Sequence, residues 1–73
     1  MARVTLYTRD GCEHCVRQRA AIVASGDTLS EVNLSREPQA MTELLKLTAG
    51  RRIVPVLVRA GRIEVAPEGG TEF

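Results

Sequence analysis

The chain has 73 residues, ten basic and nine acidic side chains, a net charge of +1 and a hydrophobic content of 44%. This length suits one small domain, residues 1–73, which buries only about 60% of the surface of its unfolded chain. The near-neutral charge and the single Tyr and Phe disfavour nucleic-acid binding, and no apolar run is long enough for a membrane span.

The first half of the chain follows the pattern strand, helix, strand. Residues 3–7 alternate polar and apolar side chains and lead into a turn at Gly11, which predicts a strand. A helix is predicted over residues 13–25, because Ser25-Gly26-Asp27 stops it and four apolar residues have helical spacing: Val16, Ala20, Val23 and Ala24. Residues 29–34 alternate again and predict a second strand.

The second half predicts a helix and then a hairpin. Pro38 suits a first helical turn, Gly50 suits a helix end, and four residues between them share one face: Met41, Leu44, Leu45 and Thr48. Residues 56–58 and 62–65 flank a short connection with Gly61 near its end, which predicts paired strands. Residues 66–73 are polar and rich in helix breakers, and we expect a flexible or short helical tail.

The resulting order is βαβαββ. A strand, a crossover helix and a second strand at the start of the chain predict a parallel pair. The fold class is therefore α/β, with a small mixed four-stranded sheet and two helices.

Cys12 and Cys15 are the only cysteines of the chain and lie where the first turn becomes a helix. A disulfide between them would close a four-residue loop and stabilise the fold by only about 2 kcal/mol, so it would contribute little as a structural disulfide. The first residues lack the apolar core of a secretory signal, and we expect a cytoplasmic protein. In that compartment a CxxC pair is more often catalytic or metal-binding than structural.

The position of each cysteine predicts a different role. Unpaired N–H groups at a helix start favour a Cys12 thiolate, with Arg9 close enough in sequence to add positive charge. Cys15, one turn further along the helix, is then the resolving thiol. Glu13 and His14 are predicted tuning residues that act in opposite directions, since a carboxylate disfavours a neighbouring thiolate and a protonated imidazole favours it.

Two segments together resemble the glutaredoxin family of the thioredoxin-like superfamily. The first is VTLYTR, residues 4–9, followed by Gly11-Cys12-Glu13-His14-Cys15, and the second is TAGRRIVP, residues 48–55. The likeness covers about residues 3–65 and implies a thioredoxin-like fold with thiol-disulfide oxidoreductase activity. It implies a cis peptide bond before Pro55, which then faces the dithiol.

The resemblance also implies the substrate groups. Val54 would offer its backbone to a peptide-like thiol, and Arg9 with Arg51 or Arg52 would hold a carboxylate. Glutathione is the expected co-substrate, with no bound cofactor and no metal. The expected partners are glutathione or a flavoprotein reductase and disulfide-containing protein substrates.

The chain departs from the family pattern at several positions. Glu13-His14 replaces the common Pro-Tyr, Ile53 replaces Thr, and Gly69-Gly70 lies further along than the family's glycine pair. The sequence ends where the family's final helix would begin, so one sheet face is expected to be less covered, and a monomer or weak homodimer is expected.

Other functions share a CxxC pair. A metal carrier or iron-sulfur scaffold would use both thiolates but needs ligands from outside the chain. A non-enzymatic binding module would leave the pair without a chemical role.

Overall fold

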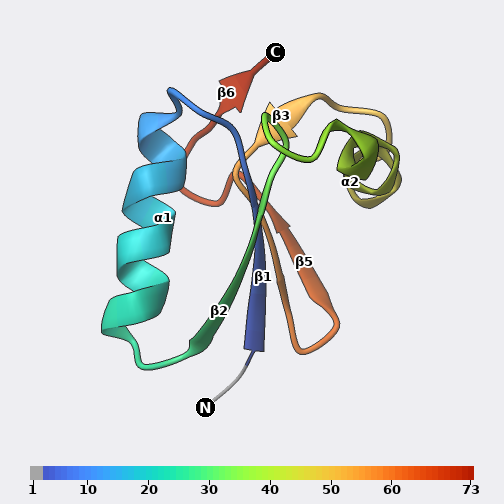
Figure 1. Cartoon of the computed structure of the whole chain (residues 1–73). Helices are drawn as coiled ribbons and strands as arrows, with labels where there is room; N and C mark the ends of the chain where they lie inside the picture. Colours follow the sequence, from blue (N-terminus) through green and yellow to red (C-terminus); the bar gives the residue numbers. More distant parts are fainter. Residues whose placement is uncertain (1–2) are drawn as a thin grey trace.

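The structure is a computed structural model that describes residues 3–73. A sheet lies between two helices, with α1 on one face and α2 on the other (Figure 1). Along the chain the elements are β1 (Arg3–Thr8), α1 (Glu13–Ala24), β2 (Thr28–Asn33), a short 3-10 helix (Pro38–Ala40), α2 (Met41–Leu47), β3 (Ile53–Val54), β4 (Val56–Arg59), β5 (Arg62–Val65) and β6 (Thr71–Glu72). None of the helices within residues 3–73 is long and apolar enough to cross a membrane.

The main sheet has the strand order β2-β1-β4-β5. β1 and β2 are parallel, whereas β4 is antiparallel to both β1 and β5. Ala60 and Gly61 join β4 to β5 with φ angles of +48° and +77°, which suits a two-residue hairpin turn of type I′. The predicted α/β class, the parallel pair and the mixed four-stranded sheet with two helices are confirmed.

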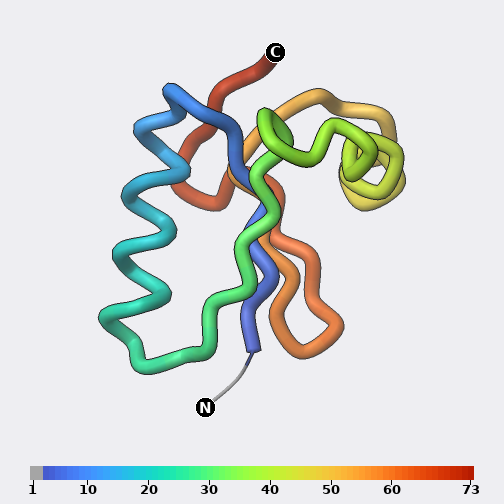
Figure 2. The backbone as a smooth tube through the Cα atoms, in the orientation of Figure 1, coloured from blue at the N-terminus to red at the C-terminus, as the bar shows by residue number. Residues whose placement is uncertain are grey.

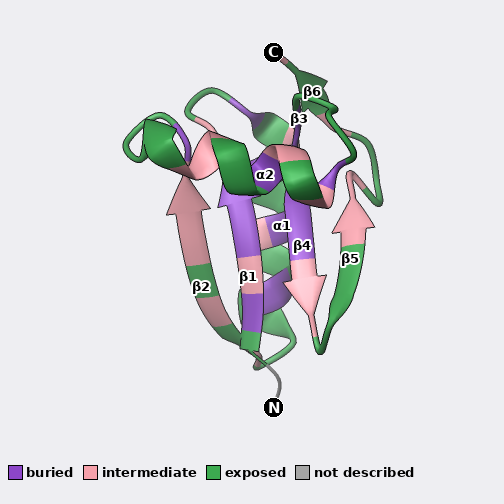
Figure 3. Cartoon of the chain, turned by 90° about the vertical axis from the view of Figure 1, so that its right-hand side faces the viewer, coloured by how far each residue is buried: buried purple, intermediate pink, exposed green. Residues whose placement is uncertain are grey.

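The core has two clusters of buried side chains. One joins α1 to the sheet through Val4, Leu6, Ile22 and Leu57. The other contains both cysteines together with Tyr7, Leu34, Leu44, Val54 and Val56. Figure 3, with α2 in front of the sheet, shows the buried residues concentrated along the central strands β1 and β4. The dithiol is thus part of the packed core.

The buried stripe of α1 differs from the apolar spacing that predicted the helix. The buried residues are Cys15, Gln18 and Ile22, while Val16 and Val23 are 56% and 62% exposed. Gln18 is buried because its Nε2 donates a hydrogen bond to Glu68 Oε2 at 3.0 Å. A polar residue that finds its partner 50 positions away cannot be assigned to the core from local hydrophobicity.

Residues 66–73, expected to be a flexible or short helical tail, contain a short paired strand instead of a helix. β6 lies antiparallel to β3 in a separate two-stranded sheet, and the tail passes the first turn of α1 on its way there (Figure 2). Gly70 permits this approach, since a Cβ atom there would clash with the Val54 carbonyl oxygen and lie 2.8 Å from the Ala66 Cβ. Neither contact can be inferred from residues 66–73 alone.

Candidate active site

Cys12 is the N-cap residue of α1, as predicted. Its backbone is extended, and its Sγ accepts a hydrogen bond from the Cys15 N–H at 3.1 Å. Gly11 precedes it with a φ of +79°, a conformation that glycine adopts without steric cost and that turns the chain from β1 into the helix. An N–H group directed at sulfur stabilises negative charge on that atom.

Cys15 occupies a different environment three residues later. Its side chain is fully buried, and burial, followed by contact with Cys12, raises the pKa of Cys15 to about 12 against the opposing effects of the Arg9 backbone and the Arg19 charge. Cys15 is therefore a protonated thiol at neutral pH. The two cysteines, both free, are chemically unequal.

The Val54-Pro55 peptide bond is cis, which confirms the geometry implied by the resemblance. Val54 is fully buried and belongs to the same cluster as both cysteines. The Pro55 carbonyl accepts the Ala66 N–H at 2.9 Å. Thus the segment before β4 lies against the dithiol although more than 35 residues separate them in sequence.

Arg9 directly follows β1 and Arg52 directly precedes β3, and these two predicted carboxylate-binding residues contact the same aromatic ring. The Arg9 guanidinium is 4.3 Å from the centroid of the Phe73 ring, and that of Arg52 is 5.4 Å from it. Arg51 has no such contact, and its N–H bonds to the Thr48 carbonyl at 3.4 Å. Phe73 could not be placed here from the sequence, because its partners are 64 and 21 positions away.

Glu13 and His14, the predicted tuning residues, face different surroundings. Glu13 is an exposed acidic residue in the first turn of α1. His14 is half-buried beside the tail, since a Cβ atom on Gly69 would lie 3.2 Å from the His14 Cε1. His14 therefore contacts the turn before β6, and the tuning role of both residues stays a prediction.

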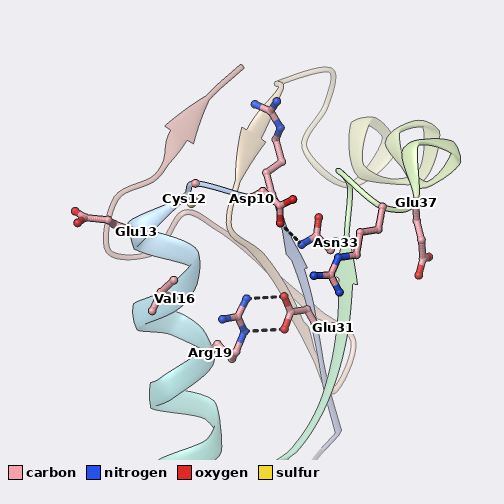
Figure 4. Close-up of a pocket in the computed structure, with 11 residues that line it drawn as sticks. Asp10, Cys12, Glu13, Val16, Arg19, Glu31, Asn33 and Glu37 are labelled. Carbon is pink, nitrogen blue, oxygen red and sulfur yellow. Dashed lines mark hydrogen bonds and ion pairs between the residues drawn. The ribbon is translucent and has the colours of Figure 1, made fainter.

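A pocket of about 730 Å³ opens beside Cys12, between α1 and β2 (Figure 4). In its wall Arg19 donates two hydrogen bonds of 2.7 Å to the Glu31 carboxylate, and Thr8 donates a third at 2.8 Å. These contacts hold the pKa of Glu31 below its usual value. The pocket is lined by Arg9, Asp10, Gly11, Cys12, Glu13, Val16, Arg19, Glu31, Asn33, Arg36 and Glu37.

Within residues 3–73, no group of three or more His, Cys, Asp or Glu side chains is placed to hold a metal ion. A metal bound by the two cysteine thiolates would need further ligands.

The glutaredoxin family profile matches residues 4–63, a range that includes both cysteines and Val54-Pro55. No curated protein matches the sequence. Because the match covers most of the 73 residues, the chain belongs to the glutaredoxin family, a family of thiol-disulfide oxidoreductases.

Proposed function

We propose that the protein reduces disulfides through a Cys12 nucleophile and a Cys15 resolving thiol. The observation that carries this proposal is the hydrogen bond of 3.1 Å from the Cys15 N–H to Cys12 Sγ at the start of α1. It stabilises a thiolate at Cys12, whereas burial keeps Cys15 protonated until it is needed. Cys12 is thus the attacking thiolate, and Cys15 is the resolving thiol.

The reaction is a two-step exchange. The Cys12 thiolate attacks one sulfur of a disulfide R–S–S–R′, forms a Cys12–S–S–R′ bond and expels RS⁻, which takes up a proton. Cys15 then loses its proton to solvent and attacks Cys12 Sγ, which forms the Cys12–Cys15 disulfide and expels R′S⁻. The substrate disulfide gains two electrons and the protein dithiol loses two.

We propose glutathione as the co-substrate and disulfide-containing proteins as substrates, in the cytoplasm. The family membership supports this choice, and so do the two arginines near the dithiol, since guanidinium groups bind carboxylates through charge-assisted hydrogen bonds. Reduction of the Cys12–Cys15 disulfide by glutathione should be faster than its reduction by a flavoprotein thioredoxin reductase with NADPH. The reverse order would replace glutathione by the reductase as the electron donor.

The test compares Cys12→Ser with Cys15→Ser, using the mixed disulfide of glutathione and 2-mercaptoethanol as substrate. Cys12→Ser should lose all activity, because Ser cannot form the mixed disulfide. Cys15→Ser should still form the glutathione adduct at Cys12, detectable by mass spectrometry. Full activity of Cys12→Ser would overturn the proposal.

A further inference from the structure

β6 pairs with β3, and Phe73 packs against the cluster that contains both cysteines. In this pairing Ile53 lies opposite Glu72 and Val54 opposite Thr71. One residue further, the Phe73 N–H donates to the Arg52 carbonyl at 3.0 Å. The end of the chain therefore forms a continuous ladder with the segment that leads into Pro55.

The ladder uses the backbone of Val54. Hydrogen-bonded and non-hydrogen-bonded pairs alternate along antiparallel strands. Arg52 and Phe73 are joined by a hydrogen bond. The next pair, Ile53 and Glu72, is therefore non-hydrogen-bonded, and the pair after it, Val54 and Thr71, is hydrogen-bonded through its backbone groups. These Val54 groups are the ones that, according to the family resemblance, would bind a peptide-like thiol.

The arginines are engaged by the same segment. The Phe73 ring lies within 4.3 Å of the Arg9 guanidinium and 5.4 Å of the Arg52 guanidinium, distances at which cations interact with aromatic faces. Phe73 also packs against the cluster that contains Cys12, whose exposure is only 4%. Residues 71–73 therefore engage both the Val54 backbone and the two arginine side chains.

We propose that residues 71–73 act as an internal substitute for substrate, a strap that an extended, peptide-like disulfide must displace before Cys12 reacts. The inference rests on the proposed function and adds a regulatory step to it. The strap can be displaced because β6 has only two residues, both exposed, and Phe73 is only half-buried. When only a fraction of the molecules is open, the apparent reactivity falls by that fraction.

The test uses the full chain with Thr71→Pro, and Glu72→Pro as its matched control. Proline at 71 removes an N–H directed at Val54, whereas position 72 belongs to the non-hydrogen-bonded pair and its N–H points away from β3. The rate of mixed-disulfide formation at Cys12 with glutathione disulfide is measured by acid quench and mass spectrometry. Thr71→Pro should react at least threefold faster than wild type, and Glu72→Pro within twofold of it.

Equal rates for wild type and Thr71→Pro would overturn the strap. No reaction of the wild-type protein with glutathione disulfide would instead overturn the proposed function, so the two failures are distinguishable.

A second measurement does not depend on a proline variant. Phe73 is the only phenylalanine, so its ring protons are unambiguous by NMR, and their contacts with Arg9 and Arg52 should disappear in the glutathione adduct of Cys15→Ser. Persistence of these contacts in the adduct would also overturn the strap.

Discussion

At the residue scale, the proposed order of the reaction depends on the inequality of the two cysteines. Cys12 Sγ accepts an N–H at the start of α1, and Cys15 is buried one turn below. Burial is the largest cause of the raised pKa of Cys15, and it remains when Cys12 is part of a mixed disulfide. In the proposed mechanism, deprotonation of Cys15 therefore limits the resolving step.

The resolving step should accelerate with pH. Below a raised pKa the thiolate fraction of Cys15 grows tenfold for each pH unit, so the release of the second glutathione from the adduct should rise about tenfold per unit from pH 7 to 9. Rapid mixing with glutathione disulfide at a series of pH values, with acid quench and mass spectrometry, measures this phase. Cys15→Ser is the control, because it should lack the phase entirely. A plateau below about pH 8 would contradict a raised pKa.

At the element scale, Glu31 joins three elements. It accepts hydrogen bonds from Arg19 of α1 and Thr8 of β1 while lying in β2 itself. The side chains of Arg19 and Glu31 are 39% and 24% exposed, so solvent screens this ion pair and its contribution is modest. The pair links α1 to β2, in addition to the buried contacts of Ile22 with the sheet.

Glu31→Gln should lower the free energy of unfolding by about 1 kcal/mol at pH 7. The pKa of Glu31 is lowered in the folded protein from an ordinary value of 4.5. Its contribution is therefore complete above about pH 5 and is lost as the pH falls through the folded-state pKa. Urea unfolding at pH 7 and at the lowest pH that keeps the fold measures the difference.

The matched control for this prediction is Glu37→Gln. Glu37 lines the same pocket but is exposed and makes no side-chain cap hydrogen bond, so its replacement should change the free energy of unfolding by less than about 0.5 kcal/mol. An equal loss for Glu31→Gln at acid and neutral pH would show that charge is not the cause.

The elements that the sequence predicted correctly depend on local signals. Gly26, with a φ of +81°, follows the Ser25 C-cap of α1, and Leu44 and Thr48 lie on the predicted buried face of α2. β3 and β6 were missed because each has two residues, too few for an alternating pattern. Their pairing depends on contacts between positions about 18 apart.

The candidate site was also only partly predictable from the sequence. Cys12 and Cys15 were identified because their spacing and the helix start are adjacent in sequence, and Val54-Pro55 came from the family resemblance. The Phe73 contacts and the Arg19–Glu31 pair could not be predicted, since each joins segments that only the tertiary fold brings together. The two cysteines could thus be found from the sequence, whereas the tertiary contacts around them could not.

At the scale of the whole molecule, the face of the sheet against which α1 packs is polar near β5. Leu57 belongs to the α1-side cluster and lies opposite Glu64, so the two share a face. Arg59 and Arg62 are the next pair on that face. This edge of the sheet does not need an apolar partner.

The 73-residue chain should therefore be a monomer in solution. Within residues 3–73 the exposed large hydrophobic side chains are Val16, Val23 and Ile63, two on α1 and one on β5, too few and too dispersed for a stable homodimer interface. Sedimentation equilibrium of the reduced protein up to about 100 μM should give a mass near 8.0 kDa at every concentration, and Ile63→Lys should leave it unchanged. A mass that rises with concentration in the wild type and falls back in Ile63→Lys would place a dimer interface at β5, because a single buried Lys without a partner is enough to prevent such an association.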